Sequence, residues 1–168
     1  MNYQTARDHI RTGDVIAVRR KTGFLPIATR FVTRSPYTHT GIALWCEGRL
    51  LLVQENGGGC NMVPLSQEAV YDFDVFDCPV DSHLVESWCW TLLGTRIPYG
   101  FLDLALIAGN RLLGLPLPKQ DGFGLICSAY SAVILEKAGW VPEGLPSIPW
   151  PGAVVSALGK PARIEVRN

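Results

Sequence analysis

Residues 35–55 read SPYTHTGIALWCEGRLLLVQE, and they contain two apolar runs separated by a short polar sequence. The runs at 39–45 and 50–55 are typical of strands, and the CEGR sequence between them favours a β-hairpin. We therefore expect an antiparallel sheet in the middle of the chain. The hairpin places a histidine at the start of its first strand and three polar residues at the end of its second, namely His39 and Gln54, Glu55 and Asn56.

The length of the turn decides which residue lies opposite His39. A two-residue turn at 47–48 places Asn56 there, whereas one additional turn residue places Glu55 there, on the same face of the sheet. Either side chain can hold an imidazole in one tautomer. The spacing alone leaves both assignments open.

Strand and helix patterns surround this hairpin on both sides. With a length of 168 residues, the chain is expected to form one domain over 1–168. The expected fold class is α+β, with a central antiparallel sheet flanked by helices. Strands are predicted at 15–19, 60–65, 72–80 and 163–166, and helices at 3–11, 24–33, 82–93, 101–113, 127–138 and from Pro151 onward.

Composition excludes several classes of protein. Fifteen basic and fifteen acidic residues give a net charge of zero, which does not point to nucleic acid as a partner. Five cysteines form no CxxC pair, so free thiols are expected, with no metal and no cofactor. The longest apolar run is too short and polar to cross a bilayer, and the N-terminus lacks the apolar core of a signal peptide. Cytoplasmic synthesis is therefore expected.

Cys127 in the sequence LICSAYSAVILEKAG is predicted to begin a helix. The free N–H groups at a helix start stabilise a thiolate, and they can also hold the oxyanion that forms when a thiolate attacks a carbonyl. A histidine such as His39 has a pKa near neutral and can serve as the general base. The alternative for each residue is ordinary packing, with the cysteine in the core and the histidine at the end of a strand.

These motifs together resemble a known family. The GDVIAVRR, SPYTHTGIAL and LLLVQENGGG sequences, followed far downstream by ICSAYSAVIL, are similar to the circularly permuted branch of the NlpC-type papain-like cysteine hydrolases. That branch includes the YiiX and YaeF proteins and the lecithin:retinol acyltransferase-like proteins. The resemblance covers roughly residues 12–140 and implies a permuted papain-like fold, in which the cysteine helix follows the histidine strand.

The resemblance also implies roles for individual residues. Cys127 would be the nucleophile and His39 the base. An acidic residue in the family lies about sixteen positions after the histidine, which favours Glu55 over Asn56 as the group that orients the ring. Tyr37, Tyr99 and Ser128 are expected to contact the substrate.

The activity implied by the resemblance is hydrolysis of an amide or peptide bond through an acyl-enzyme. The expected substrate is a peptidoglycan stem peptide, and the expected setting is a phage or bacterial cell-wall peptidase, associated with a virion or delivered to the wall. A lipid-directed acyltransferase or thioesterase of the same fold is the alternative within enzymes. A non-catalytic virion-structural or binding domain is the alternative from another class. The sequence does not predict an oligomeric state.

Overall fold

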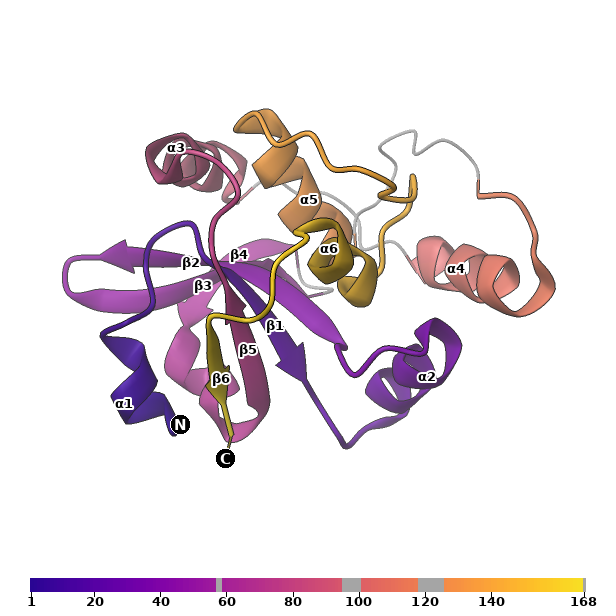
Figure 1. The fold of residues 1–168 in the computed structure, drawn as a ribbon, viewed down its shortest axis with the longest axis horizontal. Helices are drawn as coiled ribbons and strands as arrows, with labels where there is room; N and C mark the ends of the chain where they lie inside the picture. Colours follow the sequence, from indigo (N-terminus) through magenta and orange to yellow (C-terminus); the bar gives the residue numbers. More distant parts are fainter. Residues whose placement is uncertain (57–58, 95–100, 118–125, 168) are drawn as a thin grey trace.

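The computed structural model describes residues 1–56, 59–94, 101–117 and 126–167 (Figure 1). The expected α+β fold with an antiparallel sheet and flanking helices is confirmed. The strands are β1 (Val15–Arg19), β2 (His39–Cys46), β3 (Arg49–Glu55), β4 (Cys60–Pro64), β5 (Asp72–Phe76) and β6 (Ile164–Val166). The helices are α1 (Tyr3–Arg7), α2 (Phe24–Thr33), α3 (Ser82–Leu92), α4 (Phe101–Leu113), α5 (Cys127–Lys137), α6 (Pro151–Ala157) and the 3₁₀ helix η1 (Leu65–Val70).

The six strands form one sheet in the order β4-β3-β2-β1-β5-β6, and every neighbouring pair is antiparallel. Helices α3, α5 and α6 lie on one side of this sheet and α1 lies on the other, while α2 and α4 lie together beyond the ends of the strands (Figure 1). Among the described residues, no helix has the length and apolar composition needed to cross a membrane.

Alternating residues of the strands bury apolar side chains on both faces of the sheet, as the period of two in a strand requires. One face packs against α5, with Val15, Ile42, Leu44 and Val53 meeting Ala129, Ile134 and Leu135. The opposite face packs against α1 and η1, with Ile16, Val18, Leu52 and Phe73 meeting Tyr3, Ile10 and Leu65.

The turn between β2 and β3 has two residues. Cys46 pairs with Arg49, and both turn residues have positive φ, 48° at Glu47 and 74° at Gly48. Positive φ at both central positions is the pattern of a type I′ turn, whose twist matches that of the flanking strands. The sequence left two turn lengths open, each with its own register. The structure has the register that belongs to the two-residue turn.

Six elements are shorter than predicted, and four of them, β4, β6, α3 and α5, are shorter by one residue. Helix α1 ends at Arg7 because Asp8 caps it and the chain then turns back toward the sheet. Strand β4 ends at Pro64, which has no N–H to continue the ladder, and η1 begins directly after it. Strand β5 ends at Phe76 instead of continuing to residue 80.

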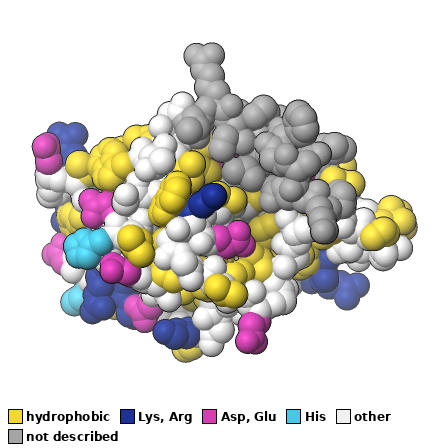
Figure 2. Space-filling view, turned by 90° about the horizontal axis from the view of Figure 1, so that it is seen from above, with side chains coloured by type: hydrophobic (Ala, Val, Ile, Leu, Met, Phe, Trp, Pro, Cys, Tyr) yellow, Lys and Arg dark blue, Asp and Glu magenta, His cyan; other side chains and the backbone are white. Residues whose placement is uncertain are grey.

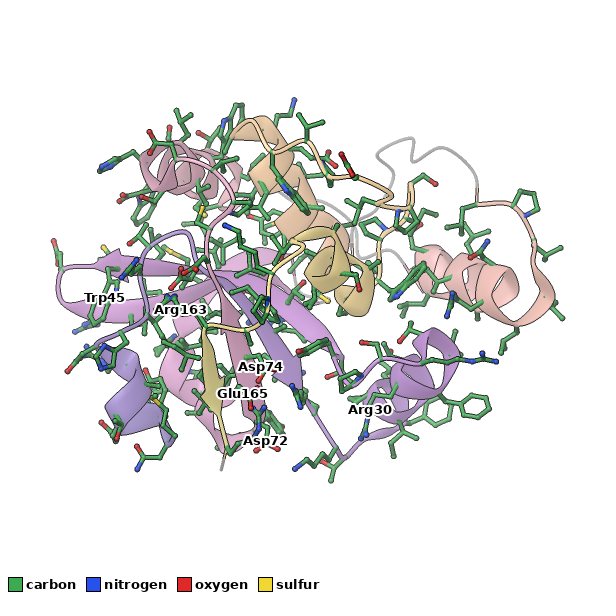
Figure 3. The ribbon with its side chains drawn as sticks, viewed as in Figure 1. Arg30, Trp45, Asp72, Asp74, Arg163 and Glu165 are labelled. Carbon is green, nitrogen blue, oxygen red and sulfur yellow. The ribbon has the colours of Figure 1, made fainter. Side chains whose placement is uncertain are left out.

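Strand β5 carries a buried charge cluster that the sequence pattern did not predict. Asp74 is fully buried between β1 and β6, and it accepts hydrogen bonds from Arg19, from the Tyr37 hydroxyl at 2.6 Å and from Arg167 at 2.7 Å. Figure 3 shows Asp74 next to Asp72 and Glu165 on the sheet. A buried carboxylate is tolerated when it is paired in this way, so the cluster joins the C-terminal strand to the centre of the sheet.

Gly41 marks a close approach between β2 and β3. A Cβ atom at this position would lie 2.6 Å from Leu52 Cδ1 and 2.8 Å from the Val53 carbonyl oxygen. Neither neighbour can move freely, because Leu52 is buried and Val53 O belongs to the backbone. The glycine therefore sets how closely β3 lies against the strand that carries His39.

We predict that Gly41→Ala lowers the free energy of unfolding by about 1–3 kcal/mol, since the added methyl group overpacks a filled site. Chemical denaturation of both proteins measures the change. The matched control is Gly109→Ala in α4, where the nearest atom is the end of the Leu115 side chain at 3.3 Å and alanine is the better helix former. An equal loss in both variants would contradict the assignment of a special role to Gly41.

Candidate active site

Cys127 is the first residue of α5, and this helix packs against β2, the strand that begins with His39. The preceding residue, Ile126, gives no side-chain cap, so the first N–H groups of the helix are not occupied by a capping side chain. The Cys127 sulfur instead accepts backbone hydrogen bonds from Ser128 and from Thr40 of β2. Its side chain is only 5% exposed. The helix start therefore holds a sulfur atom, as the sequence predicted.

Two serine side chains of α5 contact neighbouring segments and so fix the helix in this place. Ser131 donates to the Cys127 carbonyl oxygen at 3.0 Å, and its hydroxyl lies 3.3 Å from that of Thr40. Ser128 donates to the Pro149 carbonyl oxygen at 2.8 Å. These contacts join α5 to β2 on one side and to the segment before α6 on the other.

His39 opens β2, is paired with Val18 of β1, and is 6% exposed. Its ring is hydrogen-bonded to the Cys127 thiol, and its Nε2 atom lies 2.5 Å from Gln54 Oε1. An amide oxygen only accepts, so Nε2 must donate this bond. The other ring nitrogen, Nδ1, is then the one available to the sulfur. The structure thus brings together the two residues that the sequence singled out.

The group beside His39 differs from the expectation. The spacing left Glu55 and Asn56 open and the resemblance favoured Glu55, but in the structure the His39 ring donates its hydrogen bond to Gln54. The register explains this outcome. With Ile42 opposite Val53, side chains alternate so that Gln54 and His39 share one face of the sheet, while Glu55 shares the opposite face with Val53.

A signal for Gln54 was present in the sequence. If the turn has two residues and Asn56 lies opposite His39, then Gln54 is the diagonal neighbour on the same face, within reach of a long side chain. Glu55 instead accepts from the Gly59 N–H at 3.1 Å, and Asn56 accepts from Asn61 at 2.9 Å.

The electrostatics of the pair favour a thiolate and an imidazolium. Burial by itself raises the pKa of the Cys127 thiol, but His39 and the Thr40 and Ser128 N–H groups outweigh it, so the pKa lies below its usual value. Burial by itself lowers the pKa of His39, but the adjacent Cys127 sulfur outweighs it, so the pKa is raised. The two shifts have one cause, because each charge stabilises the other.

A cavity of about 180 Å³ opens beside this pair. Its polar wall includes Arg20, Thr38 and Asn56, and its apolar wall includes Leu25, Leu104, Ile126 and Pro151. A second cavity of about 120 Å³ shares Leu25, Thr29, Leu104, Ile126 and Pro151 with the first, and it continues between α2 and α4 past Val32, Ile107 and Ala108. The candidate site is therefore a small pocket with one polar and one apolar wall, and with an apolar extension.

Of the remaining predicted residues, those that the structure describes do not line the cavity beside Cys127. Tyr37 donates its hydroxyl proton to Asp74, and its ring lines a different cavity of about 570 Å³ with Arg111 and Trp150. Ser128 is fully buried, and its hydroxyl is engaged by Pro149, so its contribution to the pair is its backbone N–H. Tyr99 lies outside the described residues.

We predict that iodoacetamide alkylates Cys127 faster than Cys46 at about pH 6, well below the ordinary thiol pKa. The reason is that a lowered pKa keeps the thiolate populated as the pH falls. Peptide mass spectrometry after timed labelling gives the rate at each cysteine. Cys89 is the internal reference, since burial raises its pKa to about 12.

The matched variant for this prediction is His39→Asn. Without the imidazolium, the labelling profile of Cys127 must move to higher pH. A profile that is unchanged in the variant, or equal rates at Cys127 and Cys46 in the unmodified protein, would contradict the ion pair.

Neither a family model nor a curated protein matches this sequence. Among solved structures, the chain is similar to the metalloprotein yiiX from Escherichia coli O157:H7 (DUF1105), with a TM-score of 0.52 and 19% sequence identity. The match covers 94% of this chain and 97% of that chain. At this level of identity the likeness concerns the fold, and it agrees with the resemblance of the sequence motifs to the YiiX and YaeF branch.

Proposed function

We propose that this protein is a cysteine hydrolase of the permuted papain-like kind, in which Cys127, His39 and Gln54 act on a carbonyl compound. The observation that carries the proposal is the buried contact between the Cys127 sulfur and the His39 ring at the start of α5. A buried thiol used only for packing has no need of a charged partner or of two backbone donors. A lowered thiol pKa in a cavity is typical of a nucleophile.

The first half of the reaction forms an acyl-enzyme. The Cys127 thiolate attacks the substrate carbonyl carbon, and the N–H groups at the start of α5 stabilise the oxyanion. His39 then gives its proton to the leaving heteroatom while the bond between that atom and the carbonyl carbon breaks. Gln54 keeps the ring in place through Nε2, so that Nδ1 faces the reacting atoms.

The second half releases the acyl group. His39, now neutral, takes a proton from water, or from an acceptor alcohol or amine, as that nucleophile attacks the thioester. The carbon–sulfur bond breaks and Cys127 leaves as a thiolate beside a protonated His39. The starting ion pair is thereby restored.

The walls of the cavity favour an acyl chain as the part of the substrate next to Cys127. The extension between α2 and α4 is lined mainly by aliphatic side chains, among them Val32, Leu104 and Ile107. The charged residue of the polar wall, Arg20, is already paired with Glu68 at 2.6 Å. A cell-wall stem peptide, the substrate implied by the sequence resemblance, carries charged groups that this lining matches less well. It remains the other candidate.

The yiiX structure is described as a metalloprotein. In the described part of this chain, no group of three or more His, Cys, Asp or Glu side chains comes together in a way that could hold a metal ion. These residues therefore do not fit a metal centre, and we derive no step through a metal.

We predict that Cys127→Ala abolishes hydrolysis of short acyl thioesters, since the nucleophile is lost, whereas Gln54→Ala lowers kcat by about 10–100-fold, as expected for a group that positions another. Steady-state assays give both values. Cys46→Ala and Gln67→Ala, at residues that do not line either cavity, are the controls. Glu55→Gln tests whether Gln54 or Glu55 orients the His39 ring. A lower kcat in Glu55→Gln together with an unchanged kcat in Gln54→Ala would assign this role to Glu55.

The non-catalytic alternative makes the opposite prediction for the same proteins. A binding or virion-structural domain would turn over no acyl thioester, peptide or muropeptide and would give no acyl adduct at Cys127 by intact-mass analysis. Turnover that is unchanged in Cys127→Ala would also contradict the proposed function.

The acyl-chain assignment predicts a dependence on chain length. Thioesters with medium acyl chains should be hydrolysed with higher kcat/KM than the acetyl compound, by roughly fourfold for each buried methylene. Ala108→Trp fills the extension and should abolish this preference while the acetyl compound is still hydrolysed. Equal kcat/KM values along the series, together with cleavage of muropeptides, would favour the cell-wall substrate.

A further inference from the structure

The end of the molecule formed by α2 and α4 exposes an unusual amount of apolar surface. Twelve large hydrophobic side chains are exposed among the described residues, and seven of them lie at this end. We call these seven the α2–α4 surface. They are Phe24, Leu25, Ile27 and Phe31 of α2 and Leu112, Leu113 and Leu115 at the end of α4 and just after it. Hydrophobic side chains are visible at this end of the molecule in Figure 2.

Helix α2 is apolar on two faces. Phe24, Ile27 and Phe31 follow the spacing of one helix face, and Phe24 and Phe31 are 85% and 76% exposed. Ala28 and Val32 lie on the other face and line the apolar cavity. A helix that is apolar all round is normally enclosed by protein or by lipid, and a contiguous exposed patch marks an interaction site.

The charged residues of α2 and of the chain on either side of it have one sign. No acidic residue occurs between Asp14 and Glu47, whereas five basic residues do: Arg19, Arg20, Lys21, Arg30 and Arg34. The first three pair with carboxylates of the sheet and η1. Arg30 and Arg34, by contrast, make no ion pair with any described residue. Figure 3 shows Arg30 on α2, at the opposite end of the molecule from Trp45.

We infer that the α2–α4 surface docks on a lipid bilayer that contains anionic lipids. Exposed Phe and Leu side chains enter the boundary between headgroups and acyl chains, while unpaired arginines next to them attract anionic headgroups. A second copy of this chain would cover the apolar residues equally well, but it would bring Arg30 and Arg34 together with further positive charge. The charge complementarity therefore favours the bilayer.

The position of the candidate active site agrees with docking on a bilayer. This part of the inference rests on the proposed function, because it takes an acyl compound as the substrate. Leu25 belongs to the exposed surface and also lines both cavities. The same two helices thus form the docking surface and the walls of the apolar extension. An acyl chain that leaves the bilayer between them reaches Cys127 without crossing water.

Flotation of the full chain with vesicles tests the inference. We expect binding to vesicles in which about a third of the lipid is phosphatidylglycerol, and binding to phosphatidylcholine alone that is weaker by about tenfold. Phe24→Ser with Phe31→Ser should lower the affinity for both kinds of vesicle by about tenfold or more. Arg30→Gln with Arg34→Gln should remove only the preference for phosphatidylglycerol.

The matched control is Val70→Ser with Val141→Ser, since these side chains are 70% and 86% exposed but lie away from α2 and α4. It should bind as the unmodified protein does. Equal binding by all variants, or no binding by the folded unmodified protein, would overturn the inference. So would a dimer in light scattering that the Phe24→Ser and Phe31→Ser changes dissociate, because the occupant would then be a second copy.

Two further readouts separate this inference from the proposed function. Cys127→Ala should bind vesicles normally, since docking needs no nucleophile. Phe24→Ser with Phe31→Ser should hydrolyse a water-soluble acetyl thioester at the normal rate, because neither residue lines the cavity at Cys127. Vesicle binding without any turnover would leave the docking surface in place and end the proposed chemistry.

Discussion

The two-residue turn between β2 and β3 is the constraint on which the candidate site depends. Because Glu47 and Gly48 both have positive φ, Cys46 pairs with Arg49, and every later pair in the hairpin follows from that register. A shift of one residue would exchange the two faces of β3. Gln54 would then turn toward α5, and a carboxylate would meet the His39 ring. The chemistry of the group beside the histidine is thus decided at the far end of the hairpin.

An amide in that position has a different effect from a carboxylate. A carboxylate would stabilise the imidazolium strongly and would compete with the Cys127 thiolate for the same positive charge. Gln54 offers a neutral acceptor, so the ring is held in place and the thiolate remains its charged partner. Cys127 and His39 are nearly closed to water. The pKa of the Cys127 thiol is therefore lowered by the His39 ring and by the N–H groups of Thr40 and Ser128.

The sequence predicted those features that depend on residues close together in the chain. The apolar periodicity and the turn residues predicted the hairpin, and the position of Cys127 before an apolar helix predicted a thiol at a helix start. Gln54 was not selected, because the turn length was left open and the family pattern favoured an acid. Asp74 was not expected to be buried, since its partner Arg167 comes from the other end of the chain. The cavity between α2 and α4 depends on tertiary packing, which periodicity does not encode.

The place of α2 and α4 beside the sheet has a consequence for the cavity at the candidate site. Within the described residues, α2 packs mainly on α4, and Thr33 is the only buried residue of α2. Elements with few buried contacts separate at a lower free energy than the core does. We therefore expect α2 and α4 to separate more readily than the sheet and α5, which keep the sulfur and the imidazole together. In the proposed reaction, the sheet and α5 would hold the sulfur and the imidazole in place, and the α2–α4 end would adapt to the substrate.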